Sequence, residues 1–207
     1  MKNALFSTAY LPPVSWMAAF LKADDAVIEK HETYPKQTYR NRCKIITSQG
    51  LLSLSIPVIK TNGNHTQTAD IKIDYSQPWQ RTHWHAIETA YNRTPYFLYY
   101  RDYFEHCYQQ KTPFLIDFNH NLLLQVLKCC GYKNHPFKYT SEYVKATDME
   151  DLRTHFSPKA NTPHIPRYMQ AFEDTLGFIE DASIIDLLFN SGTDTVNYLK
   201  KTEYKRT

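Results

Sequence analysis

The chain has 207 residues, with 24 lysines and arginines against 21 aspartates and glutamates, and a formal net charge of +3. Its composition, 42% hydrophobic and 22% charged, is ordinary for a globular protein and excludes disordered or collagen-like sequence. Duplex nucleic acid is bound by clustered lysine and arginine, so the balanced charge argues against a duplex partner. The length predicts one domain over residues 1–207.

The N-terminal region and the cysteines predict a cytoplasmic protein. Pro12 and Pro13 interrupt the apolar run of the first twenty residues, so no secretory signal is expected. No segment reaches the roughly 18 apolar residues of a transmembrane helix. The four cysteines, at positions 43, 107, 129 and 130, have neither CxxC spacing nor a metal-type pairing with histidine. We therefore expect reduced thiols and no metal site.

The first part of the chain is predicted to be mainly strands. Strands are expected over residues 3–9, 26–31, 43–50, 51–59 and 69–75. A helix is predicted over 14–23, and a polar, basic stretch fills 33–42. The strands 43–50 and 51–59 are expected to form a hairpin through Gln49-Gly50.

Helical patterns dominate after residue 76. Helices are expected over 77–92, capped by Ser76, over 96–110, and from Asn119 to the glycine at 131. Ser183-x-x-Asp186 is similar to a capping box and opens another helix. A further strand is expected over 136–143. The sequence therefore predicts an α/β or α+β fold in a single compact domain, with a strand-rich first half and a helical second half.

Several motifs together resemble one known family. They are Tyr10-Leu11-Pro12, the string from His31 to Ile45, SLSIPVI at 53–59, Trp79-x-x-x-His83, Tyr91-x-x-x-Pro95-Tyr96-Phe97, Tyr168-Met169-Gln170-x-Phe172 and SIIDLLFNSG at 183–192. These resemble the WbqC-like family of bacterial proteins over nearly the whole chain, most specifically from Lys36 to Arg42. The resemblance implies a bacterial cytoplasmic protein linked to surface-polysaccharide gene clusters. It brings no established reaction, so the chemistry has to come from the site.

The strongest local signal is the stretch from His31 to Lys44, which we call the basic-aromatic loop. It supplies the candidate substrate-binding residues Tyr34, Lys36, Gln37, Arg40, Asn41 and Arg42. Arginine offers a bidentate fork and lysine a mobile charge, so this set suits a phosphate, pyrophosphate or carboxylate. Arg42 is the leading candidate because the loop should re-enter a strand there. The alternative interpretation is the solvated face of an edge strand.

The turn at Tyr10 is a second candidate. A turn that leads from a strand into a helix directs backbone N–H groups toward an anion, so Tyr10 is expected to line the substrate pocket. The order of elements loosely resembles nucleotidyltransferases, but their His-x-x-His motif is missing here. The five glycines form neither a GxGxxG nor a Walker A pattern, so no cofactor is identified.

Histidines supply the candidate catalytic groups. On a helix, His83 lies in one row with Trp79, Ile87 and Tyr91, which is more typical of a hydrogen-bonded core histidine than of a catalyst. The functional alternative is a buried general acid or base. His85 points away from His83, so the pair is a poor metal chelate. His31, at the mouth of the loop, is the other candidate.

Two functions remain open from the sequence. The first is a group-transfer enzyme (acyl, aminoacyl or glycosyl) of surface-polysaccharide or envelope-precursor synthesis, with a small phosphate-bearing ligand and with His31 or His83 moving protons. The second is a non-catalytic protein that binds an anionic ligand or a partner in envelope assembly. Binding to single-stranded nucleic acid is a weak third possibility. The sequence does not indicate the oligomeric state.

Overall fold

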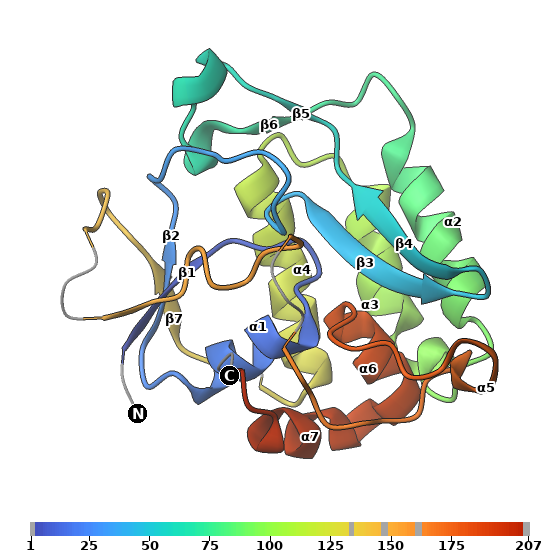
Figure 1. Ribbon diagram of the computed structural model, residues 1–207. Coiled ribbons are helices and arrows are strands. Elements are labelled where there is room, and N and C mark those ends of the chain that lie inside the picture. The colour runs from blue at the N-terminus through green and yellow to red at the C-terminus, as the bar shows by residue number, and fades with distance from the viewer. Residues whose placement is uncertain (1–2, 133–134, 146–148, 160–162, 205–207) are drawn as a thin grey trace.

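A computed structural model of the chain, which describes residues 3–132, 135–145, 149–159 and 163–204, contains a four-stranded parallel sheet. Its strands are β1 (Ala4–Ser7), β2 (Ala26–Glu29), β7 (Phe137–Tyr139) and β8 (Glu150–Asp151), in the order β7-β2-β1-β8. All three pairings are parallel, so the four strands end at the same edge. The predicted mixed α/β fold is confirmed (Figure 1).

Helix α1 (Val14–Lys22) connects β1 to β2, because neighbouring parallel strands need a crossover. Its apolar face packs on the sheet. The rings of Trp16 and Phe20 lie 5.3 and 5.4 Å from the ring of Phe6 in β1. The predicted strand–helix–strand opening is therefore present with nearly the expected bounds.

The hairpin of β3 (Arg42–Thr47) and β4 (Gly50–Ser55) forms where the sequence predicted it. The strand predicted over 69–75 is mostly wrong. Only β6 (Lys72–Ile73) pairs, with β5 (Val58–Ile59), and short 3-10 helices cover Gly63–His65 and Thr68–Asp70. The amides of Thr68 and Ala69 bind the carbonyls of Glu32 and Lys30 instead of a strand ladder. Residues 68–70 thus brace the basic-aromatic loop.

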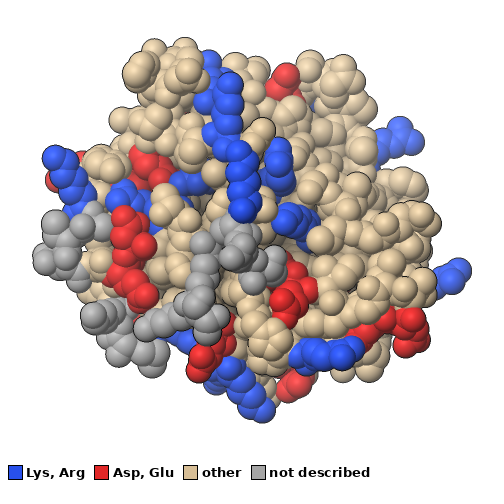
Figure 2. Space-filling view, in the orientation of Figure 1, with Lys and Arg blue, Asp and Glu red and all other residues tan. Residues whose placement is uncertain are grey.

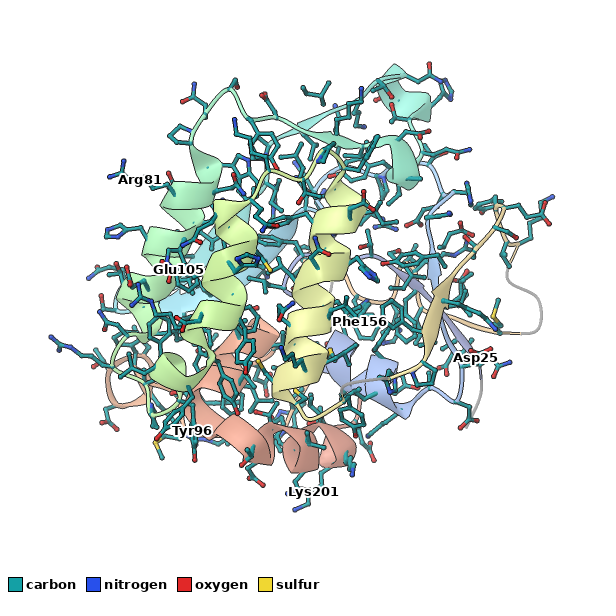
Figure 3. All side chains as sticks on the ribbon, turned by 180° about the vertical axis from the view of Figure 1, so that it is seen from behind. Asp25, Arg81, Tyr96, Glu105, Phe156 and Lys201 are labelled. Carbon is teal, nitrogen blue, oxygen red and sulfur yellow. The ribbon has the colours of Figure 1, made fainter. Side chains whose placement is uncertain are left out.

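Three helices follow in the chain: α2 (Trp79–Tyr91), α3 (Phe97–Gln109) and α4 (Leu115–Cys129). Helix α2 packs against β3 and α3, and α3 packs against α4. Seen from behind, α4 stands between α3 and the sheet (Figure 3). The prediction that α4 begins at Asn119 is wrong: it starts at Leu115, because its apolar face continues upstream. The predicted cap at Ser76 is also wrong, since Pro78 precedes the helix without a side-chain cap.

The last described segment holds α5 (Glu173–Leu176), α6 (Ile184–Ser191), a 3-10 turn at Gly192–Asp194 and α7 (Thr195–Lys201). The predicted helix after Ser183 is present, but its capping box is wrong. The Ser183 hydroxyl donates to the carbonyl of Leu11 at 2.9 Å and so ties α6 to the turn after β1.

One hydrophobic cluster joins the sheet to the helices of the second half, as the predicted single domain requires. All four cysteines are free and buried within it or at its border. In the described residues, none of the helices combines the length and the apolar character needed to cross a membrane.

Candidate functional site at the carboxyl edge of the sheet

The carboxyl edge of the sheet is where this fold concentrates polar side chains. The chain goes from β1 to β2 on one side, while β8 lies on the other side of β1. In open parallel sheets, ligands bind at the carboxyl ends near such a reversal of strand order. Ser7, Thr8, Arg40 and Arg153 line a crevice there of about 10 Å³. The crevice has room for about one water molecule, so it is too small to hold a substrate.

Arg40 is fixed at this edge by a buried ion pair. Its guanidinium donates to both carboxylate oxygens of Glu32, at 2.8 and 2.7 Å, and also to the hydroxyl of Ser7. The side-chain amide of Asn119 donates to the Arg40 carbonyl at 2.8 Å and to the Thr8 hydroxyl at 3.1 Å. Arg40 is only 4% exposed, so it organises the loop rather than presenting a free cation.

Glu29, at the end of β2, is fully buried and holds three segments together. Its carboxylate accepts hydrogen bonds from the amide of His31 at 2.7 Å, the hydroxyl of Thr140 at 2.8 Å and the amide of Val144 at 2.8 Å. Arg153 lies 3.9 Å away and neutralises part of its charge. This carboxylate therefore fixes the geometry of the edge.

The structure brings three predicted residues of the basic-aromatic loop together: Tyr34, Arg40 and Arg42. Burial raises the pKa of Tyr34 to about 12, while the nearby charges of Arg40 and Arg42 oppose that rise. The ammonium of Lys60 lies 5.3 Å from the centre of the Tyr34 ring. β3 begins at Arg42 as expected, and the Arg42 guanidinium donates to the Ser55 hydroxyl at 3.0 Å. Figure 2 shows lysines and arginines gathered on this face.

The other loop candidates have different surroundings. Lys36 and Gln37 are exposed, and Gln37 has a positive φ of 59° at the tip of the loop. Asn41 donates from its side chain to the carbonyl of Ile56 at 2.8 Å, which joins the loop to the end of the hairpin. His31 is partly exposed, and its Nδ1 lies 3.2 Å from the Gln67 side-chain oxygen.

Tyr10 and His83 pair with each other in the core. The Tyr10 hydroxyl is 2.9 Å from His83 Nδ1 and 2.6 Å from the Tyr108 hydroxyl. Burial lowers the pKa of His83 to about 4, although a hydrogen bond to the backbone of Ser55 opposes the change. This arrangement matches the core interpretation of His83.

A cavity of about 340 Å³ opens beside the loop, against the ends of β2 and β7. Lys30, Asp117, His120 and Tyr139 supply its polar lining. His120 Nδ1 is 2.9 Å from the Tyr139 hydroxyl. Burial lowers the pKa of His120, and the Asp117 charge opposes that effect.

Sequence reasoning missed this group because its members come from three distant segments. Because α4 was predicted to begin at Asn119, Asp117 lay outside the helix and its position one turn before His120 was not recognised. The apolar spacing of Leu115, Phe118 and Leu122 was the available signal, because it extends the helix upstream and places Asp117 and His120 three residues apart on one face.

A second cavity, of about 550 Å³, lies between the start of α2 and the end of α3. Arg81 and Glu105, on its rim, lie on these two neighbouring helices in Figure 3. None of the residues predicted from the sequence to form the site lines it, so the carboxyl edge remains the candidate site.

The protein is therefore an α/β protein with a basic loop beside a parallel sheet. The model of the WbqC-like protein family matches residues 8–159, and the chain belongs to that family. It is similar to an uncharacterised protein of Mycobacterium tuberculosis, Rv1507c, with 23% identity over 228 aligned residues, 96% of this chain and 97% of that protein. A comparison with solved structures found no match.

Proposed function

We propose that this protein is a cytoplasmic group-transfer enzyme that binds a phosphate-bearing substrate through its basic-aromatic loop. The transferred group is acyl, aminoacyl or glycosyl, and the product is a surface polysaccharide or another envelope precursor. The observation that carries the proposal is the grouping of Arg42, Tyr34 and Lys60 beside the carboxyl edge of the parallel sheet.

The charges of this group support binding of an anion. The charge of Arg40 is neutralised by its ion pair with Glu32, whereas Arg42 donates a hydrogen bond to the neutral hydroxyl of Ser55. Arg42 thus keeps a net positive charge, and Lys60 adds a second one across the Tyr34 ring. A phosphate gains strong charge-assisted hydrogen bonds from such donors.

The non-catalytic alternative is favoured by one observation. His83, one of the two predicted proton carriers, is buried and hydrogen-bonded in the core. If His31 also stays clear of the bound ligand, the loop serves a binding protein and not an enzyme. Turnover of any ligand that binds, followed by product analysis, separates the two functions.

A thermal-shift screen tests the proposal. The panel contains sugar nucleotides, coenzyme A thioesters, nucleoside triphosphates and pyrophosphate, each on the wild type and on Arg42→Ala. A ligand at about 100 times its Kd adds roughly 2.7 kcal/mol of stability. We expect a stabilising ligand whose effect is lost in Arg42→Ala. If Arg42→Ala binds every ligand as tightly as the wild type does, the proposal is contradicted. If no ligand of the panel stabilises the wild type, a macromolecular partner is favoured.

A further inference from the structure

The cavity beside the loop has the chemistry of a proton-transfer site. A histidine, a tyrosine, a carboxylate and an ammonium group meet there, from α4, from the end of β7 and from the residue after β2. The apolar wall comes from Ala69, Phe114 and Ile116. With a volume of about 340 Å³, the cavity has the size of a small-molecule pocket.

We propose that this cavity holds the acceptor of the transfer reaction, a molecule with a reactive hydroxyl or amine, and that His120 is its general base. This inference rests on the proposed group transfer. Lys30 lines the cavity and stands between Glu29 and His31 in the chain, so the cavity adjoins the loop that holds the phosphate. Donor and acceptor would thus meet at the carboxyl edge of the sheet.

The contacts of His120 fit the role of a base. When Nδ1 donates its proton to the Tyr139 oxygen, 2.9 Å away, Nε2 keeps a free lone pair. Partial burial keeps the ring neutral, and Asp117, one turn earlier on α4, stabilises the imidazolium that forms on protonation. Burial also raises the pKa of Tyr139, so its hydroxyl stays neutral. Histidine is thereby set up to accept a proton.

The reaction step is a simple displacement. A bond forms between the acceptor oxygen or nitrogen and the transferred group, while the bond from that group to the donor breaks. The electron pair of the broken bond leaves with the phosphate-bearing fragment of the donor. The proton of the acceptor hydroxyl or amine passes to Nε2 of His120. Lys30, at the border of cavity and loop, offsets the negative charge that develops on the leaving fragment.

NMR of the full-length protein with ¹³C-labelled histidine tests the site without knowledge of the natural substrate. The His120 signals are assigned with His120→Gln and titrated with pH and with three probes: glucosamine, glycerol and glycine. We expect a His120 pKa below the ordinary value, a further decrease in Asp117→Asn, and a shift of the His120 signals with at least one probe. The signals of His106, an exposed histidine on α3, should stay in place when the probes are added.

The inference is overturned if none of the probes moves the His120 signals, or if Asp117→Asn leaves the His120 pKa unchanged. With a donor found by the thermal-shift screen, His120→Gln should stop its turnover in the presence of the active probe and keep its stabilising effect. Turnover at the wild-type rate also overturns the inference. Loss of donor binding in Arg42→Ala is a separate result, so failure here leaves the donor site intact.

Discussion

Arg40 and Glu32 form a buried, bidentate ion pair, with N–O distances of 2.8 and 2.7 Å, at the carboxyl edge of the parallel sheet. The two residues are eight positions apart, so the pair closes the basic-aromatic loop on itself. The loop is thereby held in shape before any ligand arrives, and Arg42, two residues further on, projects from a fixed base. Preorganisation of this kind lowers the entropic cost of binding.

The first prediction concerns the stability of this pair. Arg40→Ala leaves the Glu32 carboxylate buried and unpaired, which costs about 3–5 kcal/mol of unfolding free energy. Arg42→Ala removes a hydrogen bond near the surface and costs less than about 1 kcal/mol. Urea denaturation of both variants measures the difference. Equal stability of the two variants contradicts the assigned role of Arg40.

The second prediction concerns Glu29, whose two oxygens accept three hydrogen bonds. In Glu29→Gln one oxygen becomes an NH₂ group that faces an N–H or O–H donor, so unfolding free energy falls by about 2 kcal/mol or more. Glu142→Gln, at an exposed position near the end of β7, is the matched control and should be neutral. An unaffected midpoint for Glu29→Gln in urea would show that this carboxylate does not hold the edge together.

The third prediction concerns pH and His83. Because burial lowers the folded-state pKa of His83 to about 4, the unfolded chain binds a proton between about pH 6.5 and 4 that the folded protein does not. Stability should therefore fall as the pH decreases through this range, by roughly 3 kcal/mol from His83 alone. Above pH 6.5 His83 is neutral in both the folded and the unfolded state, so it causes no loss of stability there.

The measurement compares the unfolding free energies of the wild type and His83→Gln from pH 7 to pH 4. Subtraction removes the effect of the buried carboxyls of Asp181 and Asp186, whose pKa values burial raises to about 6 and which act in the opposite direction. The advantage of the wild type should shrink as the pH falls. A difference that stays constant with pH would mean that His83 is not held neutral in the core.

Local patterns in the sequence predicted much of the fold, because periodicity and turn residues act over a few positions. The β1–α1–β2 unit and the β3–β4 hairpin are examples. The two-residue strand β8 has no periodicity to detect, and it exists only because Glu150 and Asp151 pair with β1. The segment 69–75 alternates like a strand, but contacts with Glu32 and Lys30 turn its start into a 3-10 helix.

The site was predictable only where its residues are close in the sequence. The loop from His31 to Lys44 is one segment, so its charges were visible. Its internal ion pair was not, because a row of residue types does not show which charges neutralise each other. The meeting of His120 with Tyr139 and Lys30 depends on how α4 packs beside β2 and β7. Such a tertiary contact leaves no local signal.

The most direct test of the central claim is isothermal titration calorimetry with pyrophosphate on the wild type, Arg42→Ala and Arg93→Ala. Arg93 is an exposed arginine after α2, outside the loop, and serves as the control. We predict that pyrophosphate binds the wild type and Arg93→Ala equally. Arg42→Ala should bind it roughly tenfold more weakly or not at all, since a charge-assisted hydrogen bond is worth about 1.5–3 kcal/mol. Equal affinity in Arg42→Ala and the wild type, or no binding to the wild type, would contradict the account.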